Sequence, residues 1–157
     1  MNLASPNVTL LTEQQLVGSL VELMQQEQDL LIKADAEGLA ALMPHKSELV
    51  QQLANLAGER HKALGAAGFA ASESGMEPWL AASGAPDVRA QWQQLLGLTA
   101  QAKELNRVNG MLINKQLAHT RAALGALQTP GEAPEAGVYG PGGQTIGGGP
   151  SKRFVVG

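Results

Sequence analysis

The three histidines could bind a metal ion or transfer protons, because imidazole does both near neutral pH. His45, His61 and His119 lie far apart, and no HxxxH or CxxC pattern accompanies them. On one continuous helix, the first two would be about 24 Å apart. We therefore expect three surface histidines and no metal site.

The remaining polar residues do not form a recognisable catalytic set. Cysteine is absent, and no GxSxG motif places a serine on a strand-to-helix turn. The stretch GPGGQTIGGGPSK matches neither GxGxxG nor GxxxxGK[ST]. Four carboxylates are expected on polar, solvated helix faces: Glu13, Glu22, Glu27 and Asp29. We predict that the chain is not an enzyme and needs no cofactor.

The composition narrows the class of protein. Aromatic residues make up 3% of the 157 residues, so a core must be built mainly from Leu, Ala, Val and Met, which is typical of helix packing. The net charge is −3 and no basic cluster occurs beyond Lys152 and Arg153, which argues against a nucleic-acid partner. No run of 18 apolar residues appears, and the start, MNLASPNVTLLTEQQL, does not resemble a signal peptide. The absence of cysteine fits a reducing compartment.

Apolar spacing predicts an antiparallel helical hairpin in the first half of the chain. The first helix is expected over 12–33, opened by a capping box of Thr12 and Gln15. Asp35 is the expected N-cap of the next element. A short turn over 36–43 and a new helix starting at Pro44 fit the preference of proline for a first turn. The alternative is one kinked element joined through Met43 and Pro44.

The second half contains the longest predicted helix. Residues 65–86 are rich in Gly, Ala and Ser and are expected to form a loop with one helical turn at 77–80. A helix then runs from Pro86 or Asp87 to about Gln128, roughly 60 Å in length. Partners of about 20 residues cannot cover such a helix. It must pack on two elements, project, or pair with another chain. The predicted fold is all-α, with a hairpin or bundle and one long C-terminal helix.

The composition changes at residue 129. The last 29 residues contain nine glycines and four prolines, and few side chains there could offset the entropy of ordering the backbone. We predict a helical domain over 1–128 and a flexible tail over 129–157.

The stretch LNRVNGMLINKQLAHTRAALGAL, residues 105–127, combines a helical apolar spacing with asparagines that weaken a helix interior. Asn106 and Asn109 are three positions apart and share a face. A buried asparagine would fix the register of a helix seam, an exposed one would bind a partner, and both could be ordinary surface residues.

Several segments in this order resemble the FlgN family of flagellar export chaperones. They are KADAEGLAALMPHKSELVQQL, the NxxNGMLI motif from Asn106 to Ile113, and VYGPGG from Val138 to Gly143. The resemblance covers about residues 10–146. It implies a cytoplasmic chaperone that binds hook-associated proteins, prevents their premature assembly and delivers them to the flagellar type III export gate.

The resemblance also suggests where partners bind. An amphipathic client helix is expected on the distal half of the long helix, at Leu105, Asn106, Asn109, Leu112, Ile113 and Leu117. Tyr139 is expected to dock on the cytoplasmic domain of the export gate. Without client, self-association could cover the apolar surface. The competing hypothesis is a generic helical adaptor or coiled-coil oligomer without flagellar clients.

Overall fold

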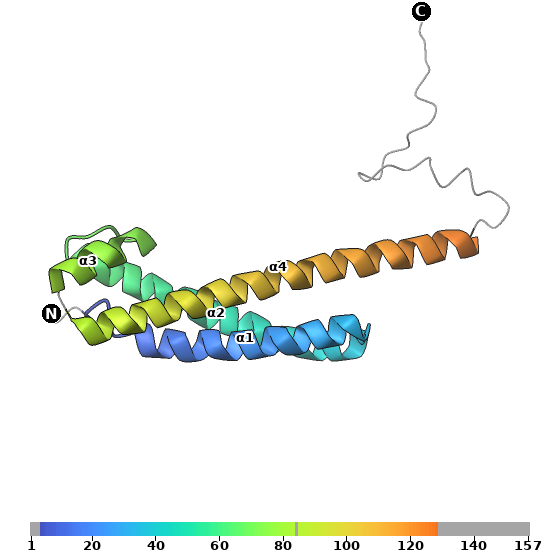
Figure 1. The fold of residues 1–157 in the computed structure, drawn as a ribbon, viewed down its shortest axis with the longest axis horizontal. Coiled ribbons are helices and arrows are strands. Elements are labelled where there is room, and N and C mark those ends of the chain that lie inside the picture. Colours follow the sequence, from blue (N-terminus) through green and yellow to red (C-terminus); the bar gives the residue numbers. More distant parts are fainter. Residues whose placement is uncertain (1–3, 84, 129–157) are drawn as a thin grey trace, which may run out of the picture. The chain divides into compact units, whose positions relative to one another are not determined.

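The computed structural model describes residues 4–83 and 85–128, and these are almost entirely helical (Figure 1). The elements are, in order, α1 (Leu10–Ile32), α2 (Ala36–Ala66), the short 3-10 helix η1 (Glu73–Gly75), α3 (Met76–Ser83) and α4 (Pro86–Gln128). No strand occurs among the described residues. The predicted all-α fold with a long C-terminal helix is confirmed. The tail, including Tyr139, lies outside the described residues.

The first helix begins two residues before its predicted start. Thr9 occupies the N-cap position of α1, and its hydroxyl donates to Glu13 Oε2 at 2.8 Å instead of capping a backbone amide. A preceding turn, in which the Val8 amide donates to the Ser5 carbonyl, already directs the chain into the helix. The predicted capping box at Thr12 is therefore wrong.

A tight connection joins α1 to α2. Ala34 adopts a positive φ of 54°, and Asp35 caps α2 by accepting a hydrogen bond from the Gly38 amide at 2.9 Å. A β-carbon at Gly38 would lie 2.7 Å from both Asp35 Oδ2 and Leu30 Cδ2, so a larger residue would force these two side chains, including the capping carboxylate, to shift. The Asp35 cap is confirmed, and the two helices run antiparallel (Figure 1).

Proline 44 does not start a helix, which corrects that prediction. It lies inside α2, so the alternative of one element through Met43 and Pro44 is confirmed. Pro44 has no N–H to donate to the Ala40 carbonyl. Both residues are exposed, so water can bind that carbonyl and the helix continues.

The segment between α2 and α4 is more ordered than the sequence indicated. Gly68, with a φ of +91°, ends α2, and the Phe69 amide donates back to the Leu64 carbonyl at 2.9 Å. Instead of one turn at 77–80, η1 and the eight-residue α3 follow. Met76 and Leu80 are buried, so α3 belongs to the core.

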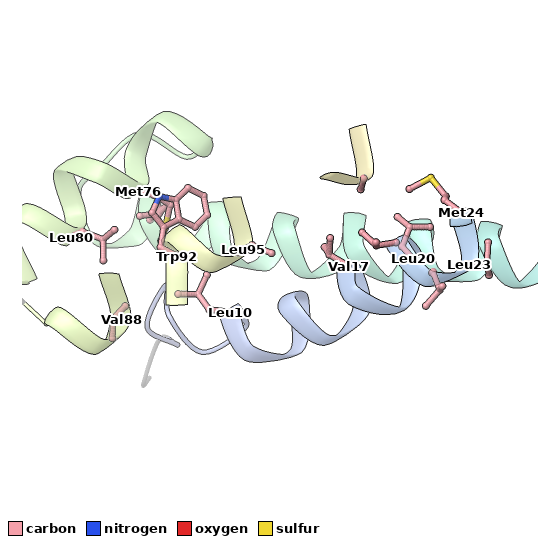
Figure 2. Packing of buried hydrophobic residues seen from close by; sticks show 14 residues of the cluster. Leu10, Val17, Leu20, Leu23, Met24, Met76, Leu80, Val88, Trp92 and Leu95 are labelled. Carbon is pink, nitrogen blue, oxygen red and sulfur yellow. The ribbon is translucent and has the colours of Figure 1, made fainter. Parts of the chain in front are cut away.

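The core follows α1 along its length. Figure 2 shows Leu10, Met76 and Trp92 close together, with Leu80 and Val88 nearby, while Val17, Leu20, Leu23 and Met24 continue along α1. Burial at three- and four-residue spacing gives α1 one apolar face. This face packs on α2 and on the first part of α4.

The chain divides into two compact units, Met1–Ile113 and Asn114–Gly157. The first contains α1, α2, η1, α3 and most of α4. Residues 114–128 are the described part of the second unit, and they form the end of α4. The predicted division at residue 129 stays a prediction.

Candidate functional site

The first unit contains an open groove of about 920 Å³ with walls from α2 and α4 and a floor from α1. From α1, the buried side chains of Val17, Leu20 and Met24 contribute. From α2, Val50 and Leu53 line the opposite wall. Most lining side chains are apolar, so the groove suits another apolar surface better than a charged ligand.

The wall from α4 is a single helical face. Its apolar members are Trp92, Leu95, Leu96 and Ala102, at helical spacing. Trp92 and Leu95 are buried (Figure 2), whereas Leu96 is 44% exposed and Val50, across the groove, is 50% exposed. Val50 and Leu96 therefore add exposed apolar surface to the groove.

One end of the groove contains a buried charge cluster. Arg60 of α2 donates from Nε and Nη2 to Glu13 of α1, at 2.9 and 3.1 Å, and from Nη2 to Glu73 Oε1 at 2.8 Å. Its guanidinium also lies 4.9 Å from the centre of the Trp92 ring, within cation–π range. The cluster therefore links α1, α2, η1 and α4.

The cluster shifts two pKa values. Burial acts to lower the pKa of Arg60, but hydrogen bonds to Glu13 and Glu73 outweigh it and raise that pKa. Burial acts to raise the pKa of Glu73, yet the hydrogen bond from Arg60, with a smaller contribution from His61, lowers it overall. Both shifts favour the charged forms, so the cluster is a structural ion-pair network.

A second polar cluster lies toward the other end. Lys46 Nζ binds both carboxylate oxygens of Glu27 at 3.0 and 2.9 Å. Asn109 Nδ2 donates to Glu27 Oε1 at 2.8 Å and to the Met24 carbonyl at 2.9 Å. Asn109 is 1% exposed, so this is a buried contact between α4 and α1.

The two clusters correct the prediction for two carboxylates. Glu13 and Glu27 are buried, not solvated, whereas Glu22 and Asp29 are exposed as expected. The spacing of these residues in the sequence did indicate that Glu13 and Glu27 are buried. Glu13 and Glu27 continue the four- and three-residue spacing of Val17, Leu20, Met24 and Leu31, which places them on the apolar face.

The predicted client-binding residues fall in different environments. Asn106 is exposed and lines the groove. Leu105 and Leu112 are partly buried, and Leu105 packs against the core. Ile113 and Leu117 are exposed. Asn109 is the exception, because its amide is bound inside the first unit and a partner could reach it only if α4 separated from α1.

Sequence reasoning did not find the groove itself. Its rim residues Val50 and Leu96 come from helices that are far apart in the sequence, and only the tertiary structure brings them together. Each belongs to an ordinary amphipathic helix, so neither carries a local signal.

Two kinds of feature are absent from the described residues. No helix there is long and apolar enough to cross a membrane. No group of three or more His, Cys, Asp or Glu side chains in residues 4–83 and 85–128 could hold a metal ion.

Comparison with protein families gives a match over most of the chain. The family model described as FlgN protein matches residues 1–146. The chain belongs to the FlgN family. This family consists of flagellar chaperones, and the helical architecture described above agrees with that membership. Comparisons with curated proteins and with solved structures gave no match.

Membership of the FlgN family relates the exposed apolar surface to chaperone activity. A chaperone acts by covering an apolar part of its client, so it needs an apolar surface that its own fold leaves uncovered. In this FlgN-family chain, two apolar surfaces are open: the groove lined by α1, α2 and α4, and the exposed leucines near the end of α4.

Proposed function

We propose that the chain is a cytoplasmic export chaperone that binds hook-associated flagellar proteins, prevents their premature assembly and delivers them to the type III export gate. Family membership supports the chaperone activity. The observation that carries the client site is the exposed apolar surface on α4, which an amphipathic client helix could cover. Residues 1–128 form the client-binding domain in this proposal.

The client helix contacts Leu105, Asn106, Leu112, Ile113 and Leu117 in this proposal. Asn109 contributes indirectly, because its hydrogen bonds to Glu27 and Met24 hold α4 against α1. Ile113 and Leu117 are the exposed apolar residues of the set and lie four positions apart on one face. They are therefore the residues with which to test it.

Client binding is tested with Ile113→Asp/Leu117→Asp and a full-length hook-associated protein from the same bacterium. The double variant should no longer co-purify with this client, because two charges would enter an apolar contact. Ala118→Asp, at an exposed position on another face of α4, is the matched control and should bind normally. Unchanged capture by the double variant would favour the competing hypothesis of a generic helical adaptor without flagellar clients.

Delivery to the gate is assigned to Tyr139, in the segment VYGPGG. An aromatic side chain among glycines and prolines has little to pack against locally, which suits a short linear anchor. Tyr139→Ala should weaken binding to the cytoplasmic domain of the gate in calorimetry and leave client binding intact. Equal gate affinities for the two forms would reduce the tail to a tether.

A further inference from the structure

One end of the groove in the first unit presents negative charge to the solvent. All of the residues that line the groove lie within Met1–Ile113. At this end the side chains of Glu73 and Glu77 are 58 and 60% exposed. Arg60, which pairs with Glu73, is only 2% exposed, and Arg89, which pairs with Glu77, does not line the groove. We call the end at Glu73 and Glu77 the acidic end, because its accessible charges are carboxylates.

The other end of the groove presents positive charge. Lys46 of α2 and Lys103 of α4 line it from opposite walls. Lys46 is bound to Glu27, which is buried and does not line the groove. Lys103 is exposed and forms no ion pair within the described part of the chain. We call the end at Lys46 and Lys103 the basic end, and the charge of Lys103 there is available to a partner.

The two long walls of the groove have the same length. The wall from α4 extends from Trp92 at the acidic end to Asn106 at the basic end, fourteen positions or about 21 Å. The wall from α2 extends from Arg60 to Lys46, again fourteen positions and about 21 Å. A third helix of about fifteen residues would therefore span the distance between the two charged ends.

The part of the groove between its charged ends is apolar. Val50 and Leu96 expose aliphatic surface on opposite walls, over the buried floor from α1. Ala57 of α2 and Ala102 of α4 also line the groove, and their small side chains leave room for another helix to approach closely. An amphipathic helix lying along the groove would cover Val50 and Leu96 together.

We propose that the groove receives an amphipathic client helix of about fifteen residues whose two ends carry opposite charges. The cationic end of that helix lies beside Glu73 and Glu77, and its anionic end lies beside Lys103. The inference rests on the function proposed above, because the occupant belongs to a client. It adds a contact that involves neither Ile113 nor Leu117, and it states the charge pattern that the client helix must carry.

The charges of the groove make it selective among amphipathic helices. The apolar middle supplies contact area to any of them, so it does not distinguish one from another. A helix with the same charge at both ends would meet a like charge either at Glu73 and Glu77 or at Lys103. Like charges in contact oppose binding, whereas complementary charges fix the direction and register of a bound helix.

Selectivity is tested with three synthetic helical peptides of about fifteen residues that share leucines at three- and four-residue spacing. The dipolar peptide has lysines at one end and glutamates at the other, the second peptide has glutamates at both ends, and the third has lysines at both ends. In fluorescence anisotropy with the full chain, the dipolar peptide should bind at least about 10-fold more tightly than the other two. The difference should shrink as the salt concentration rises, because salt screens exposed charges.

A charge reversal at the basic end tests the role of Lys103. Lys103→Glu should weaken binding of the dipolar peptide at least about 5-fold and strengthen binding of the peptide with lysines at both ends. Lys115→Glu makes the same change at an exposed lysine of α4 that does not line the groove, so it should alter neither affinity.

The apolar part of the groove is tested with Val50→Asp/Leu96→Asp. This variant should weaken binding of all three peptides at least about 10-fold, because two charges would enter the apolar contact. Val8→Asp/Leu11→Asp makes the same two changes at exposed positions that do not line the groove, and it should bind as the unmodified chain does. Circular dichroism should show unchanged helix content in both variants, since all four residues are exposed.

The direction of the bound helix is tested by cross-linking, for which the chain is convenient because it has no cysteine. Ser74 and Asn106 are both exposed, and they line the acidic end and the basic end. A dipolar peptide with a cysteine at its lysine end should form a disulfide with Ser74→Cys and much less with Asn106→Cys. A cysteine at the glutamate end should show the reverse preference.

A full-length hook-associated protein from the same bacterium then connects the groove to the client. Val50→Asp/Leu96→Asp should weaken its binding at least about 10-fold, and Val8→Asp/Leu11→Asp should not. A client bound equally by both variants would overturn the inference and leave the proposed function standing. A chain that binds the dipolar peptide but no hook-associated protein would instead refute the proposed function.

Two further results would overturn the inference. One is equal affinity of the chain for the three peptides, which would mean that the charged ends select nothing. The other is self-association of the full chain that Val50→Asp/Leu96→Asp abolishes while peptide binding is unchanged, which would assign the groove to a second copy. Sedimentation velocity without peptide or client gives that measurement.

Discussion

The two ends of α4 differ in burial although their sequences follow the same rule. Up to Asn109, the helix buries Val88, Trp92, Leu95 and Ala102. From Met111 to Gln128 it still carries leucines at helical spacing, yet no described residue is buried. The difference shows that an apolar face indicates only a capacity for contact. Whether the face is buried depends on what lies opposite it.

The polar residues of α4 differ in the same way. Asn109 is buried against Glu27 and Met24, whereas Asn106, one helical turn earlier, is exposed at the groove. Arg107 pairs with Glu104 at 2.7 Å and also donates from Nη1 to Met111 Sδ at 3.1 Å, both exposed contacts within α4 itself. The buried contact of Asn109 ties α4 to α1, whereas the exposed contacts of Arg107 stay within α4.

The largest loss of stability is expected from a change in the charge cluster of Arg60, Glu13 and Glu73. Arg60→Ala leaves Glu13 buried without its counter-ion and removes the cation–π contact with Trp92, so it should cost about 3–5 kcal/mol in urea unfolding. Arg107→Ala, which breaks an exposed and solvent-screened pair, should have a much smaller effect on the free energy of unfolding. Similar losses for both variants would mean that the cluster does not hold the helices together.

A matched pair of leucines tests the comparison directly. Leu95→Ala opens a cavity in the core and should lower the free energy of unfolding by about 2–5 kcal/mol. Leu124→Ala, the same chemical change on the exposed part of the same helix, should cost about 0.5 kcal/mol or less in the monomer. Both are measured at a protein concentration at which sedimentation shows a monomer. If Leu124→Ala were as costly as Leu95→Ala, the end of α4 would be packed within its own chain.

Substitutions of Asn109 and Asn106 should differ in their cost to stability, by less than the two leucine substitutions do. Asn109→Ala removes two hydrogen bonds and leaves the Met24 carbonyl without the Asn109 amide, so a loss of about 1–3 kcal/mol is expected. Asn106→Ala should change stability by less than about 0.5 kcal/mol. Amide hydrogen exchange along α4 should accelerate in the first variant and not in the second. The reverse order would contradict the buried role of Asn109.

The smallest expected effect is on how the free energy of unfolding depends on pH. Arg60 lowers the pKa of Glu73 below its ordinary value of 4.5, so this ion pair contributes stability that is present above about pH 4.5 and is lost as the pH falls through the lowered pKa. The Glu73 side chain is more than half exposed, so the contribution is modest. Urea unfolding across this window should show a weaker acid dependence in Glu73→Gln. An unchanged slope would show that Glu73 contributes nothing there.

Local signals predicted much of the fold. Asp35 as a cap, the start of α4 at Pro86 and its end at Gln128 all follow from short-range chemistry that acts within one or two helical turns. A prediction was wrong where a local signal was present but the surrounding structure compensated for it. Pro44 resembles a helix start, yet it lies inside α2, where water can compensate for the missing N–H.

The candidate site was predicted only in part, for a related reason. The exposed side chains of Ile113 and Leu117 could be proposed from the helical pattern and the family resemblance. The burial of Asn109 could not be distinguished from exposure, because both alternatives use the same spacing. Glu13 and Glu27 lie on an apolar face, and that placement alone cannot say that Arg60 and Lys46 come within 3 Å of them.

The sequence by itself determined the helical class and most of the length of α1, α2 and α4, because caps, spacing and composition act locally, and its ordered motifs indicated the FlgN family. Tertiary structure alone decided which apolar faces are covered. Burial requires a second surface at contact distance, and α1, α2 and the start of α4 supply it to one another. The groove is the place where these three helices leave such a surface unfilled, and no single helix in the sequence carries that information.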